Sequence, residues 1–118
     1  MTNRRMFALV LPMLMLTTMA ALAHARLDHA EPGPDAILPT SPAQVALSFT
    51  EKLEPAFSAV TVTDAAGQRV EAGRTEVSGS RMSVPLRSLE NGVYRVMWRA
   101  VSVDTHRTEG SFSFRVGK

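Results

Sequence analysis

The sequence predicts an all-β protein, a small antiparallel Greek-key β-sandwich or barrel, and three observations lead to this prediction. Apolar and polar residues alternate with period two in several short segments. Clusters of Pro, Gly, Asn and Asp separate these segments, as turns between strands do. No segment sustains the period of an amphipathic helix over three turns. Short strands joined by such turns are typical of a two-layer β fold.

Each expected strand has one set of alternate apolar residues that should face the core. In chain order these sets are Val45, Leu47 and Phe49 in 44–50; Val60 and Val62 in 59–64; Tyr94, Val96, Trp98 and Ala100 in 93–101; and Phe112, Phe114 and Val116 in 111–116. The expected turns lie at 31–34, 39–42, 64–67, 78–80 and 91–92. Every Pro of this region falls at a turn or a strand edge, where its missing amide donor is tolerated.

The composition excludes several classes of protein. The chain has 118 residues and no Cys, so a disulfide scaffold, a thiolate nucleophile and a thiolate metal site are excluded. The length allows one small domain and is too short for a Rossmann or TIM-barrel enzyme. Basic residues are spread among acidic ones and form no stripe, so we expect no binding to nucleic acid.

Residues 1–23 are predicted to be a secretory signal peptide, and residues 24–118 the domain that remains. Arg4 and Arg5 precede an apolar stretch over 6–22, and Ala21-Leu22-Ala23 supplies the small-x-small cleavage pattern. The stretch is short and contains polar residues, which argues against a transmembrane anchor. Cleavage after Ala25 is the main alternative, and the export route, general secretory or twin-arginine, stays open. Export through this signal predicts a periplasmic protein.

Two histidines are placed where they could hold a metal ion. Cleavage after Ala23 would give His24 a free α-amine beside its imidazole, and these two nitrogens chelate one ion. Asp104 and His106 are two residues apart, so in extended backbone their side chains point to the same side. These nitrogen and oxygen donors bind Cu(II) most tightly among divalent first-row metals. From the residues alone, a metal site and an ordinary solvated surface pair both remain open.

The chain resembles the copper resistance protein CopC family over nearly all of 24–116. The residues that carry the resemblance are His24–Leu27 (HARL), Val45–Leu53 (VALSFTEKL), Gly92–His106 (GVYRVMWRAVSVDTH) and Gly110–Phe114 (GSFSF). The resemblance implies a periplasmic β-barrel of cupredoxin-like or immunoglobulin-like topology that binds Cu(II) and passes it to partners.

The same resemblance implies a set of copper ligands. These are His24 through its amine and imidazole, His106 through its imidazole and Asp104 through its carboxylate. Glu51 would lie near the copper, as a weak ligand or as an acceptor that supports one. Partners would include an inner-membrane copper transporter of the CopD type or other periplasmic copper proteins. We expect the protein itself to be a monomer.

One departure from the family predicts a single Cu(II) site and no Cu(I) site. Some members carry a Cu(I) site in a Met- and His-rich loop in mid-chain, and residues 65–81 here contain neither residue type. The methionines beyond the leader, Met82 and Met97, are expected to be packing residues. His29 could approach the copper or lie at the surface, and the surface position is the one expected.

Two other functions remain open beside a copper carrier that performs no turnover. A histidine-brace copper oxygenase also binds copper through an N-terminal His and a second His. It needs a broad substrate surface, however, and the six aromatic residues of 24–118 are expected mostly in the core. We therefore predict that the protein is not an enzyme. The third possibility is a metal-free β-sandwich interaction module.

Overall fold

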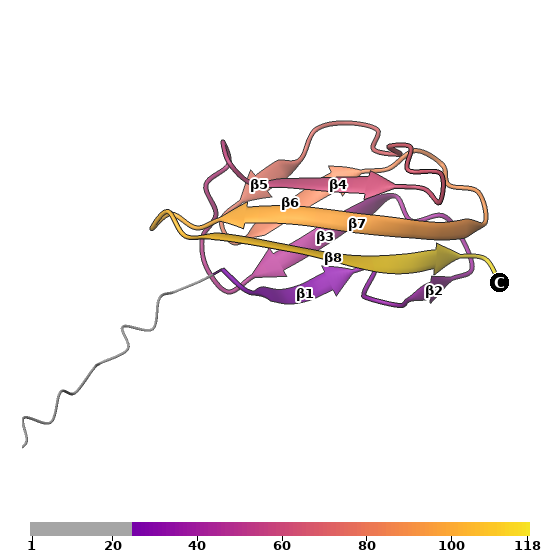
Figure 1. Ribbon diagram of the computed structural model, residues 1–118, viewed down its shortest axis with the longest axis horizontal. Coiled ribbons are helices and arrows are strands. Elements are labelled where there is room, and N and C mark those ends of the chain that lie inside the picture. The colour runs from indigo at the N-terminus through magenta and orange to yellow at the C-terminus, as the bar shows by residue number, and fades with distance from the viewer. Residues whose placement is uncertain (1–24) are drawn as a thin grey trace, which may run out of the picture.

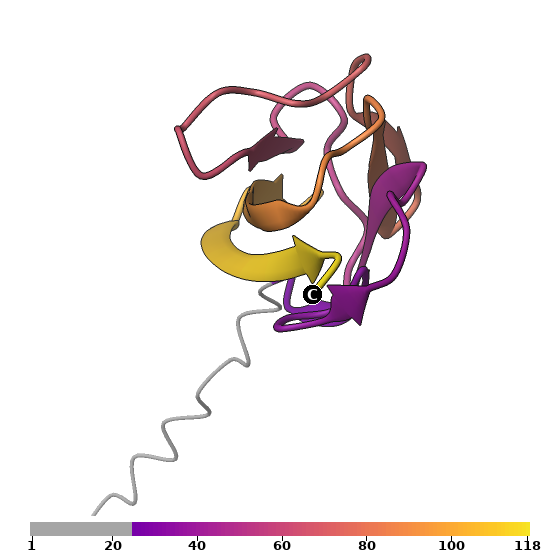
Figure 2. The same cartoon turned by 90° about the vertical axis from the view of Figure 1, so that its right-hand side faces the viewer.

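The computed structural model describes residues 25–118, which form two facing sheets of four strands each. The strands are β1 (Leu27–Glu31), β2 (Ile37–Leu38), β3 (Gln44–Phe49), β4 (Ala59–Thr63), β5 (Glu76–Ser78), β6 (Arg81–Pro85), β7 (Gly92–Val101) and β8 (Arg107–Val116). One sheet has the order β1-β3-β6-β5 and the other β2-β8-β7-β4. In Figure 1, β7 and β8 cross in front of β3 and β6. Seen from the end that carries the C-terminus, the two sheets lie on opposite sides of the interior (Figure 2).

The predicted β-sandwich is confirmed, and all four strands expected from alternation are present. The two longest, β7 and β8, pair antiparallel without interruption from Gly92↔Val116 to Val101↔Arg107. One detail differs from a wholly antiparallel sandwich, because β2 pairs parallel with β8. With two residues, β2 is too short for alternation to reveal it.

The core lies between the sheets and is built from the predicted alternate residues. Along β3, Val45, Leu47 and Phe49 are all buried, and Val60 and Val62 of β4 are buried opposite them. Burying an aliphatic or aromatic side chain of this kind contributes about 1.5–3 kcal/mol to stability. The inward residues of β6, β7 and β8 complete the same cluster: Met82, Val84, Tyr94, Val96, Ala100, Phe114 and Val116.

Trp98 packs against this core while remaining half-buried. Its indole meets the ring of Phe49 edge-on, with centroids 5.1 Å apart. It also lies over Gly110, its partner on β8, where an added Cβ would come within 2.4 Å of the indole. Gly110 is therefore the residue that allows the indole to approach the strand. This arrangement confirms the packing role expected for Trp98.

Met97, which was expected to pack, lies at the surface instead. It is 36% exposed, because its neighbours on β7, Val96 and Trp98, take the inward positions of the pleat. That expectation was wrong, whereas Met82 is fully buried as predicted. Among the six aromatic residues expected mostly in the core, Phe57 is the exception, 60% exposed in the loop before β4, where no strand alternation sets its direction.

The segment predicted to be a signal peptide, 1–23, and the candidate ligand His24 lie outside the described residues. Within 25–118, no helix is long and apolar enough to cross a membrane.

Candidate metal centre

The loop that joins β7 to β8 is a tight turn over residues 102–106. The amide of Ser102 donates to the carbonyl of His106 at 2.9 Å, and the amide of Thr105 donates to the carbonyl of Ser102 at 2.8 Å. Thr105 has a φ of 73°, in the left-handed region that β-branched residues rarely adopt. The backbone that carries Asp104 and His106 is thus held in one conformation.

Asp104 and His106, which the sequence predicted as neighbours, are in contact. Asp104 Oδ1 lies 3.2 Å from His106 Nδ1, and the amide of His106 reaches the same oxygen at 3.4 Å. The hydroxyl of Ser102, a residue only 1% exposed, also donates to Asp104 Oδ1. The side chains of His106 and Asp104 are 33% and 43% exposed, so an ion from solvent can reach them. One carboxylate oxygen therefore organises the turn and orients the imidazole.

These contacts favour the charged form of Asp104. The hydrogen bond from the Ser102 hydroxyl lowers the pKa of the Asp104 carboxyl below its ordinary value, and the hydrogen bonds and charge of His106 lower it further. The carboxyl consequently stays ionised at neutral pH, which is the state that attracts a cation.

Glu51 lies beside this turn in the segment that follows β3. The amide of Val103 donates to the carbonyl of Lys52 at 3.1 Å. Leu53 and Ser102 form an antiparallel bridge next to this bond. Glu51 is half-buried. Over residues 25–118, however, no three His, Cys, Asp or Glu side chains come close enough to hold one ion, so Glu51 does not form a cluster with Asp104 and His106.

The described chain begins next to the same turn, immediately after His24. Ala25 is fully buried, and its carbonyl accepts a hydrogen bond of 2.8 Å from the hydroxyl of Thr108. The amide of Arg26 donates to Thr50 Oγ1 at 3.0 Å, and the amide of Thr50 returns a bond of 2.9 Å to the Arg26 carbonyl. Figure 1 shows the start of the described chain at the same end of the sandwich as the β7–β8 loop, with the C-terminus at the other end.

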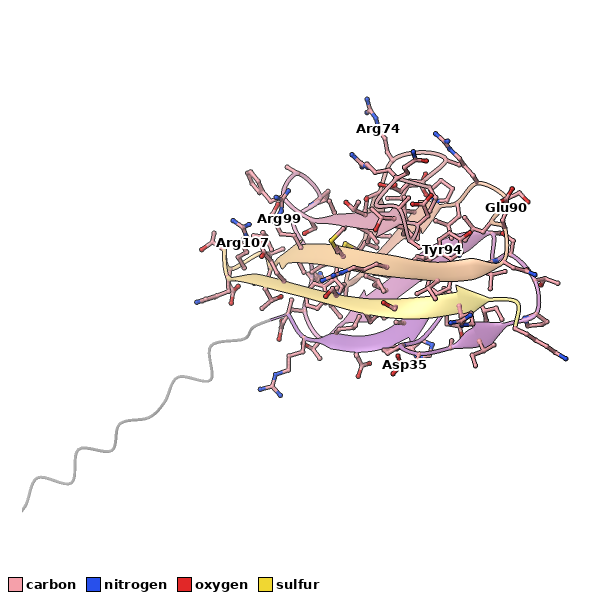
Figure 3. The ribbon with its side chains drawn as sticks, turned by 45° about the vertical axis from the view of Figure 1, so that its right-hand side comes forward. Asp35, Arg74, Glu90, Tyr94, Arg99 and Arg107 are labelled. Atoms are coloured by element: carbon pink, nitrogen blue, oxygen red, sulfur yellow. The ribbon has the colours of Figure 1, made fainter. Side chains whose placement is uncertain are left out.

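Sequence reasoning missed Thr50 and Thr108. Each stands one or two residues from a candidate ligand, Glu51 or His106, but a threonine near a strand end carries no sequence signal of its own. Figure 3 labels Arg99 and Arg107, which flank this end of β7 and β8, whereas Tyr94 lies near the opposite end, where its hydroxyl donates to the carbonyl of Glu90.

His29 lies on β1, outside the turn. Its imidazole contacts only the carboxylate of Glu31 among the ion pairs of the described chain, at 3.4 Å, and its side chain is 65% exposed. The expected surface position of His29 is confirmed.

The donors gathered at this end are imidazole nitrogen and carboxylate oxygen, without sulfur. Such donors suit a borderline or hard divalent cation. The Ser102 hydroxyl lies next to the Asp104 carboxylate but is only 1% exposed. Within residues 25–118 the turn brings together two donors that can bind a cation, Asp104 and His106.

Relatives of known name match most of the chain. A family model described as the CopC domain matches residues 27–117. Copper resistance protein C of Xanthomonas campestris pv. juglandis is 36% identical over 110 residues, covering 86% of each protein. Protein YobA of Escherichia coli K12 is 35% identical over 114 residues, covering 93% of this chain and 92% of that protein. Copper transport protein CutJ of Bacillus subtilis 168 is 34% identical over 122 residues, but this chain spans only 23% of it.

Solved structures agree with the sequence matches. The crystal structure of CopC from Methylosinus trichosporium OB3b has a TM-score of 0.74 and 29% identity, covering 79% of this chain and 93% of that one. PcoC, a methionine-rich copper resistance protein from Escherichia coli, has a TM-score of 0.69 and 32% identity, covering 80% and 99%. Because the family model and relatives above 30% identity both span most of the sequence, this protein belongs to the copper resistance protein C (CopC) family.

Proposed function

We propose that the protein is a periplasmic Cu(II) carrier that serves copper resistance or copper homeostasis and performs no turnover. Residues 1–23 would be removed on export, and residues 24–118 would form the functional domain. Copper is the cargo in this proposal. The names of two relatives, a copper resistance protein and a copper transport protein, support it.

The observation that carries the proposal is the hydrogen bond that holds Ala25 beside the turn. Ala25 is anchored to Thr108 at the start of β8, two residues beyond His106. Consecutive Cα atoms are about 3.8 Å apart. His24, as the residue before Ala25, would therefore start within reach of the turn that holds Asp104 and His106. In this proposal three segments distant in sequence would supply donors to one end of the sandwich.

In this site each residue would have a distinct role. His24 would bind the ion through its α-amine and imidazole. With His106 Nδ1 facing Asp104, a proton on Nδ1 leaves Nε2 as the nitrogen that binds the ion. Asp104 would bind the ion through its carboxylate and orient this imidazole through Oδ1, and Glu51 would support the site from the adjacent segment. This nitrogen-rich set favours Cu(II) over other divalent first-row ions.

The choice of Cu(II) over Cu(I) rests on the sulfur atoms. Met82 is fully buried, and Met97 lies on the outer face of β7 between Thr61 and Ser111 of the flanking strands. Cu(I) prefers thiolate or thioether donors. We expect reduction to Cu(I) to release the metal or to weaken its binding severely, as measured by competition with a Cu(I) chelator. A tight, stoichiometric Cu(I) complex would contradict this expectation.

The partner proposed for transfer is an inner-membrane copper transporter of the CopD type. This chain matches 23% of the copper transport protein CutJ, so a domain similar to this one occurs within a larger transport protein. In this proposal the carrier and the transporter are two separate proteins that act one after the other in copper transport. Other periplasmic copper proteins are the alternative partners, and the carrier itself is proposed to be monomeric.

The deciding experiment blocks the N-terminal amine. The exported protein, with intact mass establishing cleavage after Ala23, is compared with a protein that carries one extra residue before His24. The extension turns the amine into an amide, which is a far poorer ligand. We expect Cu(II) affinity to fall by several orders of magnitude and the metal-free thermal midpoint to stay unchanged. A matched protein with one extra residue after Lys118, at the other end of the sandwich, should bind like the parent. Equal affinity in all three proteins would refute the site.

A further inference from the structure

Two threonines hold the start of the described chain against the sandwich. The Thr108 hydroxyl donates to the Ala25 carbonyl at 2.8 Å, and the Thr50 hydroxyl accepts from the Arg26 amide at 3.0 Å. Between these bonds the Ala25 side chain is fully buried in the core cluster. The first described residues are thus fixed by one apolar contact and by hydrogen bonds to two different strand ends.

Under the proposed cleavage after Ala23, Ala25 and Arg26 would be the second and third residues of the exported chain. The first residues of most domains are poorly ordered unless a contact ties them down. Ordering a backbone residue costs about 1–2 kcal/mol in conformational entropy. A ligand that is ordered before the ion arrives does not incur this cost on binding, so preorganisation raises affinity.

We propose that Thr50 and Thr108 are positioning residues for the N-terminal copper chelate, an inference that rests on the proposed function. Neither would touch the ion. Thr108 would set the direction of the chain at Ala25 and so the place of the His24 amine. Because His106 immediately precedes β8 and Thr108 is the second residue of that strand, the same short segment carries one proposed ligand and the anchor of the other.

The chain offers a control of matching chemistry. The hydroxyl of Thr75 also bonds to backbone, accepting from the Val60 amide at 3.0 Å and donating to the Val60 carbonyl at 3.4 Å. That contact joins the segment before β5 to β4 and involves no candidate ligand. Thr75→Val therefore removes a comparable hydroxyl–backbone bond at a place without a role in the chelate.

The test measures Cu(II) affinity on the processed chain for Thr50→Val, Thr108→Val, Thr108→Ser and Thr75→Val. Loss of one hydrogen bond is expected to raise the Cu(II) dissociation constant about tenfold in Thr108→Val and less in Thr50→Val. Thr108→Ser should restore the parental value, because serine keeps the donor. Thr75→Val should leave affinity within about twofold of the parent. The thermal midpoints of the four metal-free variants are also measured, so that their stabilities can be compared.

A second background separates positioning from general stability. When an extra residue precedes His24, the amine is already lost, so Thr108→Val should lower the remaining Cu(II) affinity by less than about twofold. The positioning role would be overturned if Thr108→Val lowered Cu(II) affinity no more than Thr75→Val does. It would also be overturned if the full effect of Thr108→Val persisted in the protein with an extra residue before His24. Absence of Cu(II) binding by the processed parent would overturn the proposed function as well, so the two failures are distinguishable.

Discussion

The triplets His29-Ala30-Glu31 and Asp104-Thr105-His106 each bring an imidazole and a carboxylate together across one intervening residue. The contact is 3.4 Å in the first triplet and 3.2 Å in the second. The two sequences therefore offer similar chemistry. They differ in what surrounds the pair.

In the β1 triplet the pair stands on an extended strand, with the side chains of His29 and Glu31 65% and 77% exposed. In the loop triplet the exposed fractions are 33% and 43%, and the carboxylate also accepts the hydroxyl of the buried Ser102. Exposed ion pairs contribute little and are easily rearranged. A His–carboxylate contact becomes a candidate site only when further bonds hold it and other segments approach it.

The largest expected difference between the triplets is in the effect of removing each imidazole. His106→Ala removes a direct ligand, so it should weaken Cu(II) binding by more than about 100-fold. Loss of a residue that contacts only a ligand, and not the metal, costs up to about 100-fold. His29→Ala should leave the affinity within about twofold. Competitive titration of both processed variants measures this. If His29→Ala were as damaging as His106→Ala, copper would lie nearer to β1 than we propose.

Removing the carboxylates should give a smaller difference. Asp104→Ala should lower Cu(II) affinity about 10- to 100-fold, because the His106 ring loses its orienting partner and the site loses a negative charge. Glu31→Ala, its control, should have no measurable effect on copper. The electron paramagnetic resonance spectrum of the Cu(II) form should change only in Asp104→Ala. An unaltered spectrum and affinity in that variant would exclude Asp104 from the site.

The smallest expected difference concerns the intervening residues and the free energy of unfolding. Ala30→Gly should destabilise the metal-free protein by about 1 kcal/mol, because glycine costs backbone entropy in a strand and a buried methyl group is lost. Thr105→Gly should be neutral or stabilising by up to about 1 kcal/mol, because glycine adopts the φ of 73° without strain. Urea unfolding of both variants measures this. Equal destabilisation would show that Thr105 is not strained.

The strands could be predicted because side-chain direction in a strand is a local property. Alternation placed Val45, Leu47 and Phe49 on one face, and all three are buried. The conformation around Asp104 and His106 was not predicted correctly, because extended backbone was assumed there, whereas Thr105 has a left-handed φ of 73° in a hydrogen-bonded turn. The direction of Phe57 could not be predicted, because a loop residue faces whichever way its neighbours in space allow.

The sequence by itself determined the sandwich, the Asp104–His106 pair and the family resemblance, which already separated His106 from His29. It did not reveal the contact of His29 with Glu31 or what surrounds either pair. Tertiary structure decided which segments meet beside the Asp104–His106 turn, through the bonds of Thr50 to Arg26 and of Thr108 to Ala25, which span 24 and 83 residues. Contacts over such separations depend on how the two sheets pack against each other, and no local pattern of residues encodes that geometry.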